Sequence, residues 1–184
     1  MPNLSKRPGT GSVPVYSSDG QPYQDRVHQN GRPADQTFGA GEHLYRRYPK
    51  EYLRDGKPVP LAFQAFSFER AAGRSVNRGK YSLPEDVLEP DCCDGNFRSE
   101  YVVLQILVSE LPAEIPASNG TTYRIRPAHR PKETCYSHSE IWCNEQGDID
   151  QPYRRPPKDV RNLFYGELAR VFAKRNPLDF AAAR

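Results

Sequence analysis

The sequence contains no apolar run long enough to cross a membrane. Its longest apolar stretch, Tyr101–Val108, is far shorter than the roughly 20 apolar residues that a membrane helix needs. The first residues also lack the apolar centre of a secretory signal peptide. We therefore expect a soluble, cytoplasmic protein with no membrane partner, and the four cysteines are then expected to be thiols.

The short motifs of common enzyme and metal sites are absent as well. There is no Gly-x4-Gly-Lys-Ser/Thr phosphate loop, no Gly-x-Gly-x-x-Gly fingerprint and no Gly-x-Ser-x-Gly elbow. The cysteines and histidines form no Cys-x-x-Cys or His-x3-His pair, so we expect no metal ion and no cofactor. These absences favour an interaction or binding protein over an enzyme.

Apolar residues are also scarce. Only 36% of the chain is hydrophobic and the mean hydropathy is −0.82, while 18 prolines and 13 glycines indicate many turns. Eleven tyrosines and eight phenylalanines can still build a modest core. Residues 1–38 show no sustained apolar period, so we expect a flexible tail there, one domain over 39–176 and a frayed end over 177–184.

The apolar residues that are present predict an α+β fold. Alternation predicts about five strands in a mostly antiparallel sheet: 43–48, 60–68, 101–108, 121–126 and 136–143. The strand 101–108 is apolar on both faces and is expected to be central. A basic loop over 71–80, with one short extended piece at Ser75–Asn77, precedes a capping box, Ser82 to Glu85, that predicts a short helix. After Pro157, apolar residues at helical spacing predict an amphipathic C-terminal helix that packs on the sheet.

Charges of one sign gather in alternating blocks along the chain. Residues 39–80 hold nine basic and four acidic side chains, whereas 85–100 hold six acidic and one basic. If the basic blocks meet on one face, arginines next to tyrosines would suit a protein, nucleotide or nucleic-acid partner. The candidate anion-binding residues are Arg47, Arg74, Lys80, Arg124, Arg126, Arg130, Lys132, Arg154 and Arg155. We expect a partner in a protein complex, with nucleic acid as an alternative partner.

An enzymatic alternative rests on five other residues. Arg46 and Arg78 could hold a phosphate, Ser75 lies close to Arg78 in sequence, and His138 and Glu140 share one face of a predicted strand. The order Arg46, Ser75, Glu140 is similar to the Arg–Ser–Glu order of ADP-ribosyltransferases. That resemblance implies a small transferase or hydrolase that uses NAD or a nucleotide, although their Ser-Thr-Ser strand and Glu-x-Glu pair are absent here.

Overall fold

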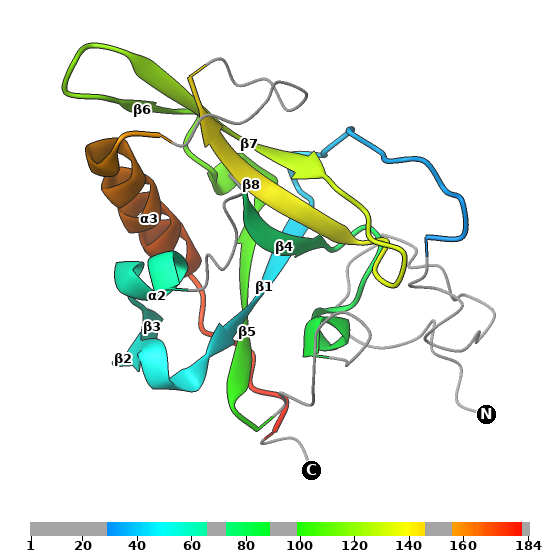
Figure 1. Cartoon of the computed structure of the whole chain (residues 1–184). Coiled ribbons are helices and arrows are strands. Elements are labelled where there is room, and N and C mark those ends of the chain that lie inside the picture. The colour runs from blue at the N-terminus through cyan, green and yellow to red at the C-terminus, as the bar shows by residue number, and fades with distance from the viewer. Residues whose placement is uncertain (1–28, 66–72, 89–98, 146–155, 182–184) are drawn as a thin grey trace, which may run out of the picture.

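Six antiparallel strands form the main sheet of the protein, which confirms the predicted α+β class (Figure 1). The computed structural model describes residues 29–65, 73–88, 99–145 and 156–181. The strands lie in the order β5-β1-β4-β8-β7-β6. Their bounds are β1 His43–Pro49, β4 Arg74–Arg78, β5 Tyr101–Leu107, β6 Glu114–Pro116, β7 Thr122–His129 and β8 His138–Asn144. A separate ribbon pairs β2 (Leu53–Arg54) with β3 (Lys57–Pro58).

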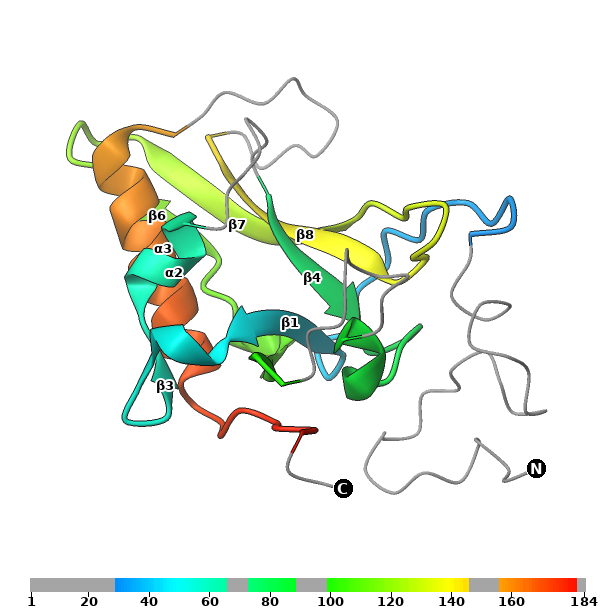
Figure 2. The same cartoon turned by 60° about the horizontal axis from the view of Figure 1, so that its bottom comes forward.

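The C-terminal helix α3, Lys158–Phe172, packs on one face of this sheet as predicted (Figure 2). Its buried apolar residues repeat at the spacing of a helix stripe, with Val160, Phe164 and Leu168 in the core. Leu163, which shares the apolar pattern in sequence, is instead half exposed. The short helix α2, Pro60–Ala65, lies beside α3, and Phe63 of α2 stacks on Phe172 of α3.

The expected strand over 60–68 is wrong where the structure describes it. Residues 60–65 form α2, with Pro60 in the first turn, where a missing amide hydrogen costs nothing. Consecutive Ala62 and Phe63 are both buried while Leu61 is exposed, which a strand's alternation does not allow. Residues 66–68 lie outside the described part of the chain.

Within the expected basic loop over 71–80, the short extended piece expected at Ser75–Asn77 is part of a longer strand. Arg74–Arg78 is a full strand, β4, with neighbours on both sides. Its only large apolar residue is Val76, so hydropathy gave no signal for a buried strand. The inward positions on either side of Val76 are taken by Arg74 and Arg78, both buried.

Strand 101–108 is present as β5 but lies at the end of the sheet order, so its predicted central place is wrong. Its second edge is covered by the chain end, because the backbone N–H and C=O of Val103 both bond to Leu178 at 2.9 Å. Lys50 also forms an ion pair with Asp179 at 2.8 Å. Part of the expected frayed end is thus docked on the sheet.

The expected capping box is replaced by another arrangement. Pro84–Leu88 is the 3-10 helix η3, and the Asp86 carboxylate, not a Ser82–Glu85 pair, accepts a hydrogen bond from the Leu83 amide at 2.8 Å. The Ser82 hydroxyl instead donates to the Arg78 carbonyl at 2.9 Å. Two further 3-10 turns, η2 (Lys50–Tyr52) and η5 (Val108–Glu110), follow β1 and β5.

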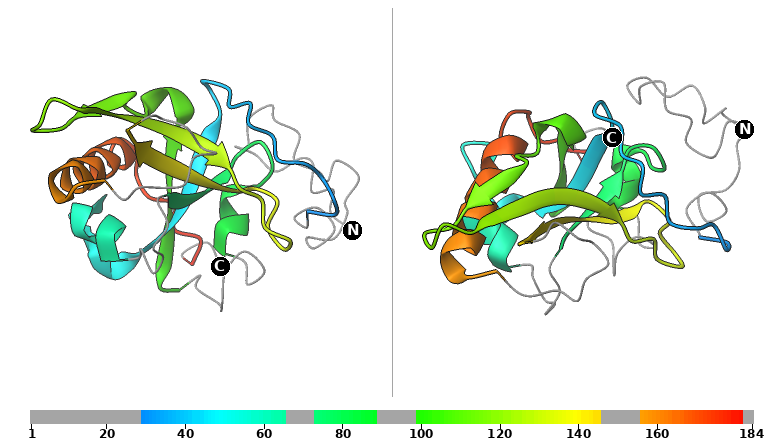
Figure 3. Two further views of the ribbon diagram at one scale, coloured as in Figure 1. Left: turned by 45° about the horizontal axis from the view of Figure 1, so that its top comes forward. Right: turned by 90° about the horizontal axis from the view of Figure 1, so that it is seen from above.

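Residues 29–42, most of which fall in the expected tail, run along the end of the molecule opposite α2 and α3 (Figure 3). We call this segment the strap. Gln29 donates its backbone amide to Glu133 at 2.8 Å, and the Gln36 side chain bonds to both backbone groups of His129. The folded body therefore begins before residue 39.

Candidate anion-binding site

Two inward side chains of β4, Arg74 and Arg78, are buried arginines that differ in their partners. Arg78 is fully buried and its guanidinium is satisfied by the strap. Its Nε and Nη2 donate to the two Glu42 carboxylate oxygens at 2.6 and 2.8 Å, a bidentate pair. Nη1 and Nη2 also donate to the carbonyls of Asp35 and Thr37 at 2.5 and 2.6 Å. With these donors used and its charge balanced, Arg78 holds the strap and is not placed to bind a ligand.

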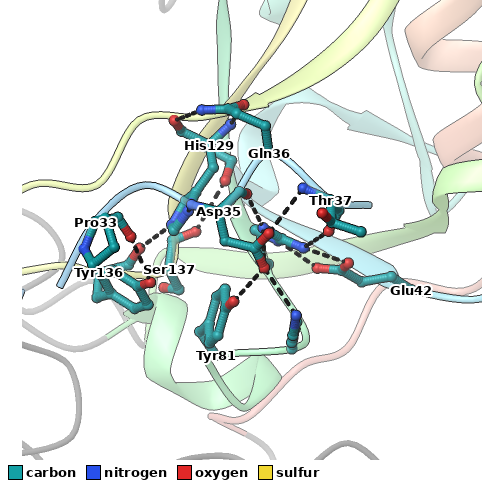
Figure 4. A network of polar contacts seen from close by, with 12 residues as sticks. Pro33, Asp35, Gln36, Thr37, Glu42, Tyr81, His129, Tyr136 and Ser137 are labelled. Atoms are coloured by element: carbon teal, nitrogen blue, oxygen red, sulfur yellow. Dashed lines mark hydrogen bonds and ion pairs between the residues drawn. The ribbon is translucent and has the colours of Figure 1, made fainter. Parts of the chain in front are cut away.

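Further polar contacts fix the strap around Arg78 (Figure 4). The Asp35 carboxylate accepts hydrogen bonds from the Tyr81 hydroxyl at 2.5 Å and from Lys80 Nζ at 2.8 Å. Burial alone would raise the pKa of Asp35, but these bonds, with that from the Thr37 amide and the charge of Arg78, hold it well below its usual value. His129 Nδ1 accepts from the Asp35 amide at 2.8 Å, and burial lowers the pKa of this imidazole.

Arg46 and Arg74 occupy the same face of the sheet toward the helices, where no acid among the described residues neutralises them. Register places Arg46 opposite Leu104, and Arg74 opposite Ile141, among core residues. The Arg46 guanidinium lies 5.2 Å from the Phe63 ring centroid, and the Arg74 guanidinium 4.7 Å from that of Tyr165 on α3. Each arginine is 7% exposed. In the described part of the chain neither forms an ion pair.

Both side chains also keep an unused donor. Arg46 Nη1 donates to the Ser75 carbonyl at 2.6 Å, and Arg74 donates to the Gly73 carbonyl at 3.2 Å and to the Tyr165 hydroxyl. The Nε groups of Arg46 and Arg74 are buried without any hydrogen-bond partner among the described residues. Burial, and then the like charge of Arg74, lower the pKa of Arg46 to about 10. Two cations therefore lie close together in the interior with donors to spare.

Tyr165 of α3 contacts Arg74, and neither Tyr165 nor Arg161 of the same helix was selected from the sequence. Tyr165 is buried and accepts from Arg74, so its own hydroxyl hydrogen has no acceptor among the residues described. Arg161 lies one turn earlier on the same helix face, and its Nε is likewise buried with no hydrogen-bond partner among the described residues. In the sequence, their Arg-x3-Tyr spacing on the predicted C-terminal helix indicates that both lie on one helix face. Donors without acceptors suit an oxyanion such as phosphate.

The structure separates the five residues of the enzymatic alternative into two sets. Ser75 pairs with Glu140, and Asn77 with His138, so these four side chains share the sheet face opposite to Arg46 and Arg78. Ser75 Oγ lies 3.4 Å from His138 Nε2. Glu140 does not bond to His138 in any described contact; its Oε2 accepts from the Trp142 indole at 2.9 Å.

The other candidate anion-binding residues do not converge on one described site. Arg124 and Arg126 point outward from β7 as predicted and are exposed, Arg124 with a long ion pair to Glu114 at 3.8 Å. Arg130 lies over the Trp142 ring at 5.1 Å, and Arg47 over Tyr101 at 5.4 Å. Lys80 is bound to Asp35, Lys132 forms a bridge with Cys135 through its backbone, and Arg154 and Arg155 lie outside the described residues.

Within the described residues, no helix is long and apolar enough to cross a membrane, and no group of three His, Cys, Asp or Glu side chains could hold a metal ion. Cys135 and Cys143 are buried, and neither forms a disulfide with a described residue. Comparison of the chain with protein-family models, with curated proteins and with solved structures gave no match.

Proposed function

We propose that the protein binds a small phosphorylated ligand through Arg46 and Arg74, with Tyr165 and Arg161 at the edge of the site. The observation that carries the proposal is the pair of arginines, each 7% exposed, that have no acidic partner among the described residues and a buried Nε without an acceptor. An uncompensated buried charge costs several kcal/mol, so proteins rarely keep one without a role.

The contrast with Arg78 supports a ligand rather than a structural role. A structural arginine in the same strand is supplied with a carboxylate and two carbonyls by the strap. From the described residues Arg46 and Arg74 receive only neutral acceptors, and their neighbours Phe63 and Tyr165 provide ring faces but no negative charge. A bound oxyanion would supply both the missing acceptors and the missing charge.

Thermal unfolding with added anions tests the proposal. Inorganic phosphate and ADP are expected to raise the melting temperature of the full chain, because a ligand that binds only the folded state stabilises it. Arg46→Met and Arg74→Met should remove that shift. Arg124→Met, which removes an equal charge from an exposed position, should keep it. Arg46→Gln serves as a second, polar variant.

The outcomes separate this site from a surface interaction. A wild-type protein that is not stabilised by phosphate, sulfate or ADP contradicts the proposal, and so does an equal shift in Arg46→Met. Binding of a single-stranded oligonucleotide that is lost in the double variant Arg124→Glu, Arg126→Glu but kept in Arg46→Met would instead point to the outward arginines of β7. The expected protein partner stays a prediction.

A further inference from the structure

The solvent-facing side of β4 carries a serine next to an oriented imidazole. Ser75 is exposed, and its Oγ lies 3.4 Å from Nε2 of His138, a buried residue of β8. Nδ1 of the same ring lies 2.7 Å from the Arg130 carbonyl oxygen. Because a carbonyl can only accept, the ring hydrogen is on Nδ1, and the lone pair of Nε2 faces the serine hydroxyl.

We propose that Ser75 is a nucleophile activated by His138 as general base, and that the pair transfers the acyl group of a carboxylic ester bearing a negative charge. The three parts that such a site needs are present: an accessible hydroxyl, a base within reach, and a third group that orients the base. Hydrogen bonds between nucleophile and base are often this long before a substrate binds. The inference does not depend on the phosphate site, because Arg46 and Arg74 lie on the opposite face.

The chemical step balances with groups on this face and water. His138 Nε2 takes the Ser75 hydroxyl proton as Oγ attacks the ester carbonyl carbon. The bond from that carbon to the alcohol oxygen breaks, and the imidazolium returns the proton to the departing alcohol. A water molecule, deprotonated by the same imidazole, then attacks the acyl-serine, which releases the carboxylic acid and restores the serine hydroxyl. No oxidant or reductant is needed.

The neighbours of the pair support its geometry and its substrate charge. Glu140, directly opposite Ser75, is fixed by the Trp142 indole and by Gly73, where a Cβ would lie 2.4 Å from the Glu140 Cβ. Glu140 is two residues from His138 on one strand face, about 7 Å away, and is held by Trp142 rather than bonded to the imidazole. The guanidinium of Arg130 lies over Trp142, and this positive group favours an anionic ester.

Labelling of the full chain with a fluorophosphonate probe, read by intact mass and peptide mapping, tests the inference. The serine oxygen displaces fluoride from phosphorus, so a single adduct on Ser75 is expected. His138→Gln should lower the labelling rate at least about 100-fold, the usual contribution of a general base. Ser75→Ala should abolish labelling. Ser118→Ala removes another exposed serine, one that donates to Asp159 at 2.9 Å rather than to an imidazole, and should change nothing.

The pH dependence adds a readout that a merely structural imidazole would not give. Burial, and then the charges of Lys132 and His129, lower the pKa of His138 to about 4 against the opposing effect of its bond to the Arg130 carbonyl. Arg130, whose carbonyl oxygen lies 2.7 Å from the ring Nδ1, and Glu140, two residues along β8, are the further charged residues next to His138. With its pKa near 4 the base is neutral from pH 6 to 8, so the rate at Ser75 should be flat there. An unassisted serine should react faster as hydroxide increases.

Three results would overturn the inference: no adduct on Ser75 in the folded wild-type chain, an adduct that persists in Ser75→Ala, or equal rates in wild type and His138→Gln. His138→Asn provides a second variant, whose amide can still donate to the Arg130 carbonyl but cannot act as a base. Melting temperatures of both variants show whether a lost rate reflects lost folding. Because phosphate stabilisation and Ser75 labelling are separate measurements, either proposal can fail alone.

Discussion

Removing a buried arginine from this protein should have opposite effects at two positions that face the same side of the sheet. Arg78→Met takes away the bidentate partner of Glu42, which is itself buried, and leaves the Asp35 and Thr37 carbonyls without a donor. Breaking a buried ion pair from one side costs about 3–5 kcal/mol. Arg78→Met is therefore expected to lower the free energy of unfolding by about that amount.

Arg46→Met leaves no buried carboxylate among the described residues without its counter-charge. Burial and the nearby charge of Arg74 lower the pKa of Arg46 from its ordinary value to about 10, which corresponds to roughly 3 kcal/mol against the charged form in the folded state. The substitution removes that cost but also the bond to the Ser75 carbonyl, a loss of about 1–3 kcal/mol. The free energy of unfolding should thus stay unchanged or rise by up to about 2 kcal/mol.

Urea unfolding at pH 7 in a buffer without phosphate measures both values. The chain has one tryptophan, Trp142, whose fluorescence reports the transition, and circular dichroism gives a second probe. Arg124→Met, an exposed control, should stay within about 0.5 kcal/mol of wild type. A loss of about 3 kcal/mol or more in Arg46→Met would refute the reasoning, because it would mean that the fold itself compensates the Arg46 charge.

Three further predictions concern the strap and the Ser75 face. The pKa of His138 falls from 6.5 to about 4 on folding, so its contribution to stability is complete above about pH 6.5. As the pH drops through 4 that contribution, roughly 3 kcal/mol, is lost. In urea unfolding, the free energy of unfolding of His138→Gln should therefore change less with pH over that window than that of the wild type. Asp35→Ala removes the acceptor for Lys80 and Tyr81, so limited proteolysis should cleave the strap faster, and an unchanged rate would count against its anchoring role. Gly73→Ala should cost about 1–3 kcal/mol and shift the Trp142 emission, since the new Cβ meets Glu140; an unshifted spectrum would argue against that contact.

The elements that the sequence predicted well are those with a clear apolar period. Alternation placed Tyr123 and Ile125 inward on β7, and helical spacing located α3, because burial of large apolar residues determines both. For β4 the sequence indicated only a short extended piece, Ser75–Asn77, inside a loop. Its inward residues are Arg74, Val76 and Arg78, and arginine is read as a surface residue unless its buried partner is known. For Arg78 those partners lie some 40 residues away in the strap.

The sequence predicted individual residues of the candidate site but not which of them lie close together. Arg46, Arg74, Ser75 and His138 were all selected, but alternation along one strand says nothing about which strands are neighbours. The proximity of Arg46 to Arg74 depends on β1 lying beside β4, and the contact between Ser75 and His138 depends on the register of β4 with β8. Grouping Arg46 with Ser75 failed for the same reason: Ser75 faces away from the inward residues of its own strand.

The composition of β4 explains why one strand can serve two separate sites. A strand in the interior of a sheet normally contributes large apolar residues, and β4 contributes only Val76, worth about 1.5–3 kcal/mol when buried. Its position must therefore depend on hydrogen bonds to β1 and β8 and on what neutralises its charges. The strap neutralises Arg78 at one end, and a bound phosphate would do so for Arg74 at the other. On the outward face Asn77 is buried and bonds to Cys135 and Ser137, whereas Ser75 is exposed and can hold a reactive hydroxyl against β8 without taking part in the apolar core.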